Sequence, residues 1–142
     1  MKKRLLCITL LTASLLTACG SKNQEVQSYE EYELNFEEKN ATDEDKHRQY
    51  LAYLENYIKD NLLEPLSEVK NANVTLQSPT DSENTINTNE EISVAVVLEL
   101  QNELSTDNTA DLADCLATAV GNTSTDEITI MDVDGNILFP KE

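Results

Sequence analysis

The stretch Glu91–Leu100, "EISVAVVLEL", decides the fold of this chain. Its large apolar side chains alternate with small or polar ones, which is the pattern of a β-strand with one buried face. The large aliphatic residues share one face: Ile92, Val94, Val96, Leu98 and Leu100. The other face is small but not strongly polar, and it carries Ser93, Ala95, Val97 and Glu99. The stretch therefore predicts a strand with a core on one side and a weakly polar surface on the other.

The segments around this strand predict the rest of the domain. Thr42 is the expected N-cap of a helix whose apolar residues recur at three- and four-residue spacing, and Pro65 ends it. A strand at 72–77 follows, a second helix is expected at about 107–120, and a last strand at 128–131. The sequence thus predicts an α+β domain with the order helix, strand, strand, helix, strand. We expect a small three-stranded sheet with two helices on one face, closed by a short Asp-Gly hairpin.

The hairpin is expected in Glu127–Pro140, "EITIMDVDGNILFP", which also raises the question of a calcium loop. An EF-hand loop needs glycine at position 6 and a bidentate glutamate at position 12. Counted from Asp132, the glycine falls at position 4, and position 12 would lie beyond the last residue given. The segment therefore predicts a type I′ turn centred on Asp134-Gly135 and no metal site. Asp132 and Asn136 are expected to bond the turn backbone.

Residues 1–41 are expected to lie outside the folded domain. Basic residues at 2–4 precede a short apolar stretch, and Leu16-Thr17-Ala18-Cys19 resembles the lipobox of bacterial lipoprotein precursors. We interpret 1–18 as a lipoprotein signal peptide, cut before Cys19, whose sulfur receives a diacylglyceryl group with palmitate-like acyl chains. The alternative is an ordinary signal peptide with an incidental cysteine. No stretch approaches the ~20 apolar residues of a membrane span, so we expect a lipid-anchored protein on the extracytoplasmic side of the cell membrane.

The lipoprotein interpretation divides the rest of the chain in two. Residues 19–41 are the lipidated cysteine and an acidic tether, and residues 42–142 are the α+β domain. One feature interrupts the tether, because Tyr32, Leu34 and Phe36 alternate in "YELNF". That segment is either a short strand or a piece that docks on the domain.

The composition argues against several classes of function. The chain has 27 acidic and 10 basic residues, a formal charge of −17, and loss of three basic residues with the signal peptide would give −20. Nucleic acid is therefore not an expected partner, because its binding needs neutralised phosphates. The sequence shows no glycine-rich phosphate loop and no serine–histidine arrangement at its one histidine, His47, so no catalytic residue, cofactor or enzymatic activity is expected. Cys115 is expected to be a buried small hydrophobe without a disulfide partner.

Five segments, in order, resemble a known family of ring-building domains. The family includes the flagellar MS-ring protein and the inner-ring lipoprotein of type III secretion systems, and the likeness runs from about Phe36 to Leu138. It rests on residues in the first helix, both strands, the second helix and the closing strand with its D-x-x-G turn: Tyr50, Leu54-Glu55, Ile58; Ala72, Val74, Leu76, Pro79; Ile92, Ser93, Val94, Val96, Leu98; Leu116, Ala117, Ala119, Val120, Gly121; Glu127, Ile128, Ile130, Asp132, Gly135, Ile137, Leu138. The resemblance implies a structural role, in which such domains pack side by side into rings at a membrane.

Three hypotheses for the function follow. The first is a single-domain lipoprotein that assembles with copies of itself, or docks on a ring, in an envelope, secretion or flagellar-type apparatus. Its candidate assembly face is the uncovered side of the sheet, with Ala95, Val97 and Met131. The second is a lipoprotein that binds a small solute or an envelope protein through the same fold. The third, an acidic surface enzyme, has the least support.

Overall fold

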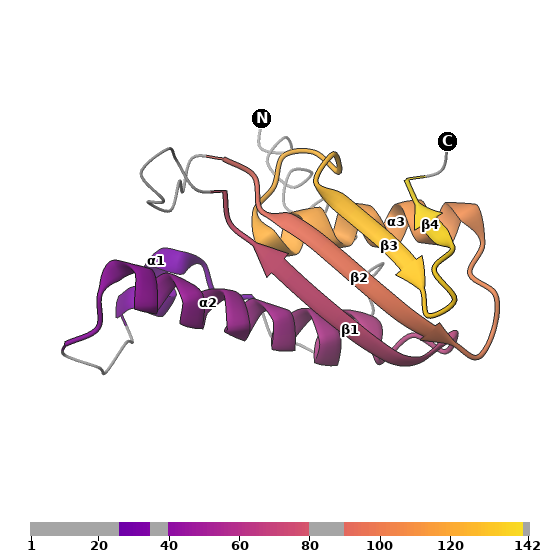
Figure 1. Cartoon of the computed structure of the whole chain (residues 1–142), viewed down its shortest axis with the longest axis horizontal. Coiled ribbons are helices and arrows are strands. Elements are labelled where there is room, and N and C mark those ends of the chain that lie inside the picture. The colour runs from indigo at the N-terminus through magenta and orange to yellow at the C-terminus, as the bar shows by residue number, and fades with distance from the viewer. Residues whose placement is uncertain (1–25, 35–39, 80–89, 141–142) are drawn as a thin grey trace, which may run out of the picture.

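The computed structural model describes residues 26–34, 40–79 and 90–140. Eight elements follow one another along these residues, and Figure 1 shows their arrangement. In chain order they are α1 (Tyr29–Leu34), α2 (Asp43–Ile58), the π-helical turn η1 (Lys59–Leu63), β1 (Val69–Gln77), β2 (Ser93–Leu100), α3 (Thr106–Val120), β3 (Ile128–Asp132) and β4 (Ile137–Phe139).

The strands form one mixed sheet in the order β1-β2-β3-β4. β1 pairs with β2 and β3 pairs with β4 in antiparallel fashion, whereas β2 and β3 are parallel and are joined through α3. The predicted three-stranded sheet with two helices is therefore wrong, because the described residues contain a four-stranded sheet and three α-helices. The additional strand β4 has only three residues, too few to show an alternating pattern of its own.

The hydrophobic core lies between one face of the sheet and helices α2 and α3. The alternation predicted for β2 is present, since Val94, Val96 and Leu98 are buried and Ala95 is exposed. The helices contribute apolar residues to the same cluster, chiefly from one stripe on each: Tyr50, Leu54, Ile58, Leu112, Ala113, Leu116, Ala117 and Val120. Burial of these side chains is the main force that holds the helices on the sheet.

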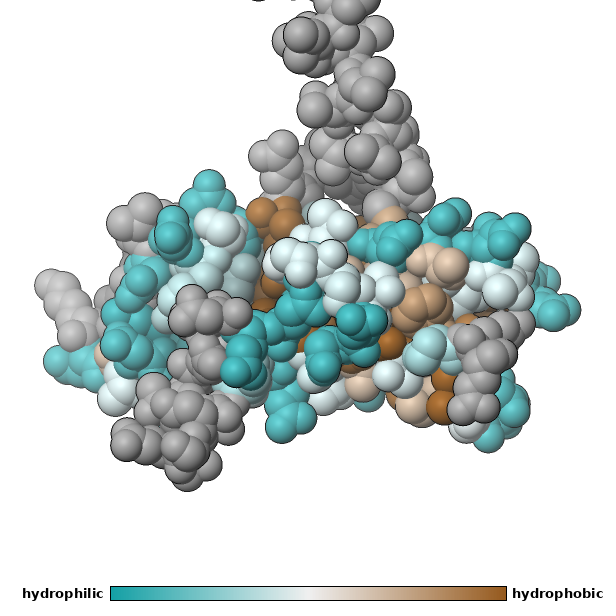
Figure 2. Space-filling model, turned by 90° about the horizontal axis from the view of Figure 1, so that it is seen from above, coloured by the Kyte–Doolittle hydropathy of each residue, from teal (hydrophilic) through white to brown (hydrophobic). Residues whose placement is uncertain are grey.

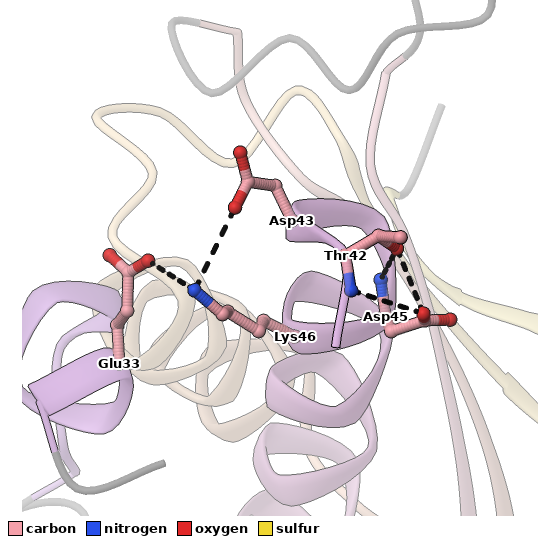
Figure 3. Close-up of polar contacts among 5 residues, drawn as sticks. All are labelled: Glu33, Thr42, Asp43, Asp45 and Lys46. Carbon is pink, nitrogen blue, oxygen red and sulfur yellow. Dashed lines mark hydrogen bonds and ion pairs between the residues drawn. The ribbon is translucent and has the colours of Figure 1, made fainter. Parts of the chain in front are cut away.

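Helix α2 begins where the sequence predicts it (Figure 3). Thr42 accepts a hydrogen bond from the Asp45 amide, and the Asp45 carboxylate accepts one from the Thr42 amide, so the two residues form a capping box. The hydroxyl of Thr42 also donates to the Asp45 carboxylate. These bonds lower the pKa of Asp45. At its other end, α2 passes into the π-helical turn η1 before Pro65, which periodicity alone did not indicate.

Helix α1 packs against α2 through aromatic side chains. The rings of Tyr32 and Tyr53 stack with centroids 5.6 Å apart, and Tyr29 lies 5.3 Å from Tyr50 in an edge-on arrangement. The Tyr50 hydroxyl donates to the Gln27 carbonyl, and burial raises the pKa of Tyr50 to about 12. The strand alternative for "YELNF" is therefore wrong over its described part, which is helical and docks on α2, while Phe36 lies outside the described residues.

One ion pair reinforces the aromatic contact between the two helices. The Lys46 ammonium on α2 lies 3.1 Å from a Glu33 carboxylate oxygen on α1 and 3.7 Å from Asp43 (Figure 3). Partly exposed pairs of this kind add little free energy by themselves. Together with the tyrosine contacts, however, the pair fixes the direction in which the chain enters the domain.

Several carboxylates hold backbone amides rather than cations. Glu55 on α2 accepts a hydrogen bond of 2.9 Å from the Leu76 amide on β1, the edge strand of the sheet. The Glu91 carboxylate accepts from the amides and hydroxyls of both Thr123 and Ser124, and these bonds lower the pKa of Glu91. Glu91 thereby ties the start of β2 to the loop that follows α3.

Helix α3 ends at Gly121, as the sequence predicts. Gly121 has φ of 81°, in the left-handed region that glycine adopts without steric cost, and its amide bonds to carbonyls of the last helical turn. The next residue, Asn122, uses its side chain on both backbone groups of Ile92. The end of α3 is thus fixed beside the start of β2.

Candidate functional site

The three residues predicted for an assembly face lie together on the side of the sheet opposite the core. Ala95 on β2 is exposed and lies between Thr75 on β1 and Thr129 on β3. Val97 lies between Asn73 and Met131 in the same two neighbouring strands. Val97 and Met131 are half-buried, and they are direct partners across the β2–β3 ladder.

Sequence reasoning missed Ile137, which extends this surface onto β4. Ile137 is 57% exposed and is paired with Met131, so both side chains lie on the same face. A register shift between Ile130 and Met131 produces this pairing. We define the open face as these residues together with their neighbours on the same side: Asn71, Asn73, Thr75, Gln77, Ser93, Ala95, Val97, Glu99, Thr129, Met131 and Ile137.

The open face is nearly free of charge on a strongly acidic chain. Glu99 is its one charged member, and the Lys70 ammonium forms an ion pair with it. The other polar members are serine, threonine, asparagine and glutamine, and the centre is apolar. Seen from above the view of Figure 1, the described surface is largely hydrophilic and carries smaller apolar patches (Figure 2). Depletion of charge around an apolar centre is the composition of a protein–protein interface core rather than of a solvated surface.

Cys19, the residue predicted to carry the lipid, lies outside the described residues. Cys115 departs from its prediction as a buried small hydrophobe without a disulfide partner, because it is half-buried and disulfide-bonded. The other cysteines in the sequence are Cys7 and Cys19, and both lie outside the described ranges. Helical spacing placed Cys115 beside the apolar stripe of the helix, but spacing alone does not determine the exposed fraction of its side chain.

The structure brings together a histidine and a serine that the sequence did not connect. His47 on α2 is 6% exposed, and its Nε2 lies 2.6 Å from the Ser78 hydroxyl just after β1. Its Nδ1 has no hydrogen-bond partner within 26–34, 40–79 and 90–140. The pair therefore lacks, among these residues, the carboxylate that orients the base in a serine–histidine–aspartate site. Thirty-one residues separate the two side chains, so no local spacing could have predicted their contact.

The Asp132 segment forms a turn, but not the predicted type I′ turn. Asp132 Oδ1 accepts from the amides of Asp134 and Asn136, and Oδ2 accepts from the Asn136 side chain, which lowers the pKa of Asp132. The Gly135 amide bonds to the Asp132 carbonyl, and the Asp132 amide bonds to the Asn136 carbonyl. These bonds enclose a three-residue loop in which Gly135, at φ of 87°, takes the left-handed position. The turn joins β3 to β4 and thereby places Ile137 on the open face.

The comparison with known proteins identifies the family. Among curated proteins, none matches the sequence. The family model described as "Secretory protein of YscJ/FliF RBM domain", the ring-building domain, matches residues 34–139. That range includes every strand of the sheet, both long helices and all members of the open face. The chain therefore belongs to the YscJ/FliF family of ring-building domains, which form rings in secretion and flagellar apparatus.

Proposed function

We propose that this chain is a lipid-anchored ring component, and that its open face is the surface on which a neighbouring copy packs. The family supports ring formation in a secretion or flagellar apparatus at the cell envelope. The lipobox-like sequence supports attachment of a lipid at Cys19 on the extracytoplasmic side. Contacts between protein surfaces then carry the function, and no reaction is assigned to the chain.

The single observation that carries the proposal is the near absence of charge on the open face. A quarter of the chain is charged, at 26%, yet the eleven members of this face include one charged residue, and Lys70 pairs with it. Val97 and Met131 present apolar atoms at its centre, and Ile137, which is more than half exposed, presents them on the edge strand β4. Such a patch gains free energy when a partner removes it from water.

Head-to-tail packing makes this surface suitable for a ring. If the open face of one copy contacts a different surface of the next copy, that next copy still has its own open face available for a third copy. Repeated contacts of this kind form a closed ring when the rotation from one copy to the next divides a full turn evenly. The helical layer lies on the opposite side of the sheet from the open face, so the two surfaces can serve two neighbours at once.

Anchoring at a membrane would strengthen a weak contact of this kind. Among the described residues, no helix is long and apolar enough to cross a bilayer. A lipid on Cys19 would confine copies to two dimensions and raise their effective concentration without any new contact. We infer that assembly takes place at the membrane.

The test of the assembly face uses Val97→Glu in the full chain, produced in cells and cross-linked on membranes. Glutamate at the centre of the open face should abolish cross-linked multimers, because its charge would have to be desolvated in the contact. Asn102→Glu is the matched control, since it adds the same charge in the exposed loop after β2, outside the open face. Circular dichroism of both variants should match the parent. Multimers that survive Val97→Glu would overturn the role of this face.

The test of the anchor uses Cys19→Ala and fractionation of the cells. We expect the variant to leave the detergent-extractable membrane, because an acidic body has little affinity for anionic lipid. Intact-mass analysis of the parent shows whether Cys19 carries a lipid. The Cys19 sulfur can form either a thioether to the lipid or a disulfide to Cys115, but not both. A Cys19 without added lipid would overturn the anchor. An anchored protein that stays monomeric, with no partner restoring assembly, would favour the binding-module alternative instead.

A further inference from the structure

The segment that precedes α1 lies at one end of the domain. Residues 26–29 line a cavity of about 350 Å³ together with Ser78 after β1, Ile92 before β2 and Asn122 after α3. We call this end, where β1 stops and β2 starts, the entry end of the domain. The turn between β3 and β4 lies at the opposite end of the strands (Figure 1).

Hydrogen bonds and ring contacts attach this segment and α1 to α2. The Gln27 amide donates to the Tyr53 hydroxyl at 3.1 Å, and the Tyr50 hydroxyl donates to the Gln27 carbonyl at 2.9 Å. The rings of Tyr29 and Tyr32 lie 5.3 and 5.4 Å from the ring of Tyr50. The family match begins at residue 34, so α1 lies outside it except for its last residue. Helix α1 therefore joins the folded body through contacts that the matched region does not include.

The docking of α1 limits how far the domain can lie from Cys19. Seven residues lead from Cys19 to Val26, and a chain of that length spans at most roughly 25 Å in any conformation. If α1 were released, the body would begin at Thr42, the N-cap of α2, and the limit would rise to roughly 80 Å. Strand β2, with eight residues, is about 26 Å long. The shorter connection is thus about as long as one strand, and the longer one is about three times that length.

We propose that docked α1 orients the domain on the membrane, with the entry end toward the bilayer and the open face turned toward neighbours in the membrane plane. The role of α1 rests on the proposed function, because it requires a lipid at Cys19. The entry end is then held within roughly 25 Å of the bilayer surface. The acidic body, with a formal charge of −17 for the whole chain, is repelled by anionic lipid, so the strands point away from the surface.

This orientation favours assembly without adding a contact. The open face runs along the strands, so it stands roughly perpendicular to the bilayer when the strands point away from it. Association costs rotational freedom, and copies that already share one orientation lose less of it. Copies held by the longer connection would meet in many orientations, of which few bring the open face against the next copy.

Energy transfer from a single tryptophan to a labelled lipid shows which end lies nearer to the bilayer. The sequence contains no tryptophan, so one substitution supplies a unique donor. Asp126→Trp places it in the exposed loop before β3, at the entry end, and Asp134→Trp places it in the exposed turn after β3. Each substitution removes one negative charge, so the two proteins are matched.

The full lipidated chain is inserted into preformed vesicles of phosphatidylcholine and phosphatidylglycerol that contain dansyl-phosphatidylethanolamine. The protein is kept dilute enough on the vesicles that copies do not meet. We expect more energy transfer from the Asp126→Trp protein than from the Asp134→Trp protein, because the entry end is the end held near the lipid.

Two further changes test whether α1 causes this difference. Tyr32→Ala should release α1 and remove the difference between the two donor positions, whereas Glu30→Ala, at an exposed position of the same helix, should preserve it. Insertion of sixteen glycine and serine residues after Lys22 gives a docked α1 the same length of chain as a released one. It should also remove the difference, and it changes no contact within the domain.

The outcomes distinguish the role of α1 from the anchor and from the assembly face. Equal transfer from both donor positions, in a protein that floats with the vesicles, would overturn the orientation. A difference that persists after the insertion, or in a Tyr32→Ala protein whose α1 exchanges its amide hydrogens rapidly, would overturn the role of α1. If Tyr32→Ala leaves α1 protected, the insertion decides the question. A parent that does not float with the vesicles would refute the lipid anchor and with it this orientation, whereas the Val97→Glu test concerns the assembly face alone.

Discussion

At the scale of single residues, several carboxylates hold the backbone in place. The sequence predicted this role for Asp132 but not for Asp45, Glu55 and Glu91. All four accept hydrogen bonds from backbone amides that would otherwise have no partner in a helix or strand. These hydrogen bonds to backbone amides do not require a basic partner, and basic residues are few in this chain.

The left-handed conformation of Gly135 gives the first prediction. At φ of 87°, a β-branched residue is strained, so Gly135→Val should lower the free energy of unfolding by about 1–3 kcal/mol. Apart from the two neighbouring residues, no atom of the described residues lies within 4 Å of the position a Cβ would take, so the cost comes from the backbone and not from a clash. Gly135→Asn is the control, because asparagine adopts this conformation with less strain. Equal stability of the two variants in urea unfolding would contradict the prediction.

The buried His47 gives the second prediction, a dependence of stability on pH. Burial lowers the pKa of the folded imidazole, whereas the unfolded chain has the ordinary value near 6.5. As the pH falls below about 6.5, the unfolded chain takes up a proton that the folded protein resists, so the free energy of unfolding decreases. The decrease stops once the pH passes the lowered pKa of the folded state.

Urea unfolding at several pH values between 7.5 and 5 measures this effect. His47 is the only histidine, so His47→Phe should flatten the dependence in this window. Asp45, Glu91 and Asp132 have lowered pKa values and lose their contributions only at more acidic pH, below their ordinary range. A parent and a His47→Phe variant with the same slope would show that the imidazole takes up its proton equally in both states.

At the scale of elements, alternation and helical periodicity predicted the long segments well. α3 was expected at about 107–120 and spans Thr106–Val120, and β2 coincides with the predicted strand from Ser93 onward. The same alternation placed Ala95, Val97 and Met131 on one face, because side-chain direction in a strand follows directly from position. Long amphipathic segments carry enough residues for their period to be unambiguous.

The elements that sequence reasoning missed are short or depend on tertiary contacts. Helix α1 has six residues, and at that length apolar residues two apart fit a strand as well as a helix. In the structure, α1 is held by tyrosine contacts with α2, which begins at Asp43. Ile137 was not assigned to the open face because the register shift beside Met131 determines its direction. The contact of His47 with Ser78 likewise needs the packed fold.

The docking of α1 gives the third prediction. Tyr32 packs against Tyr50 and Tyr53, so Tyr32→Ala should release α1 while leaving the sheet and its core intact. We expect faster amide hydrogen exchange over residues 29–34 and no change in β2 or β3, because local opening removes protection only where contacts are lost. Glu30→Ala, at an exposed position of the same helix, should leave exchange unchanged. Equal protection of α1 in the parent and in Tyr32→Ala would show that the tyrosine contacts do not hold the helix.

At the scale of the whole molecule, charge and the open face act in opposite directions. Each copy carries a formal charge of −17, or −20 without residues 1–18, which opposes the approach of identical copies. The open face has one charged member, which is paired with Lys70, and its centre is apolar, so copies that meet at this face bring few charges together. Association should therefore be governed by how far the surrounding charges are screened.

Salt dependence provides the fourth prediction. The Debye length falls from roughly 10 Å at 0.1 M salt to roughly 3 Å at 1 M. We expect the chain from residue 19 onward, with Cys19→Ala, to be monomeric or weakly associated at 0.1 M sodium chloride and to associate more strongly at 1 M. Sedimentation velocity over a range of protein concentrations measures the change. Because the proposed contact would bury mainly apolar and uncharged groups, screening should remove the repulsion without weakening the attraction.

The variants of the open face determine whether this salt effect belongs to the proposed contact. Val97→Glu should remain monomeric at both salt concentrations, because screening does not remove the cost of desolvating a carboxylate inside a contact. Asn102→Glu carries the same total charge and should associate like the parent at 1 M, since its added charge is outside the face and is screened. Association that weakens as salt is added would instead indicate a contact held by ion pairs. The next copy would then bind at a charged surface such as the region around Lys46 and Arg48, and the open face would be left to another partner.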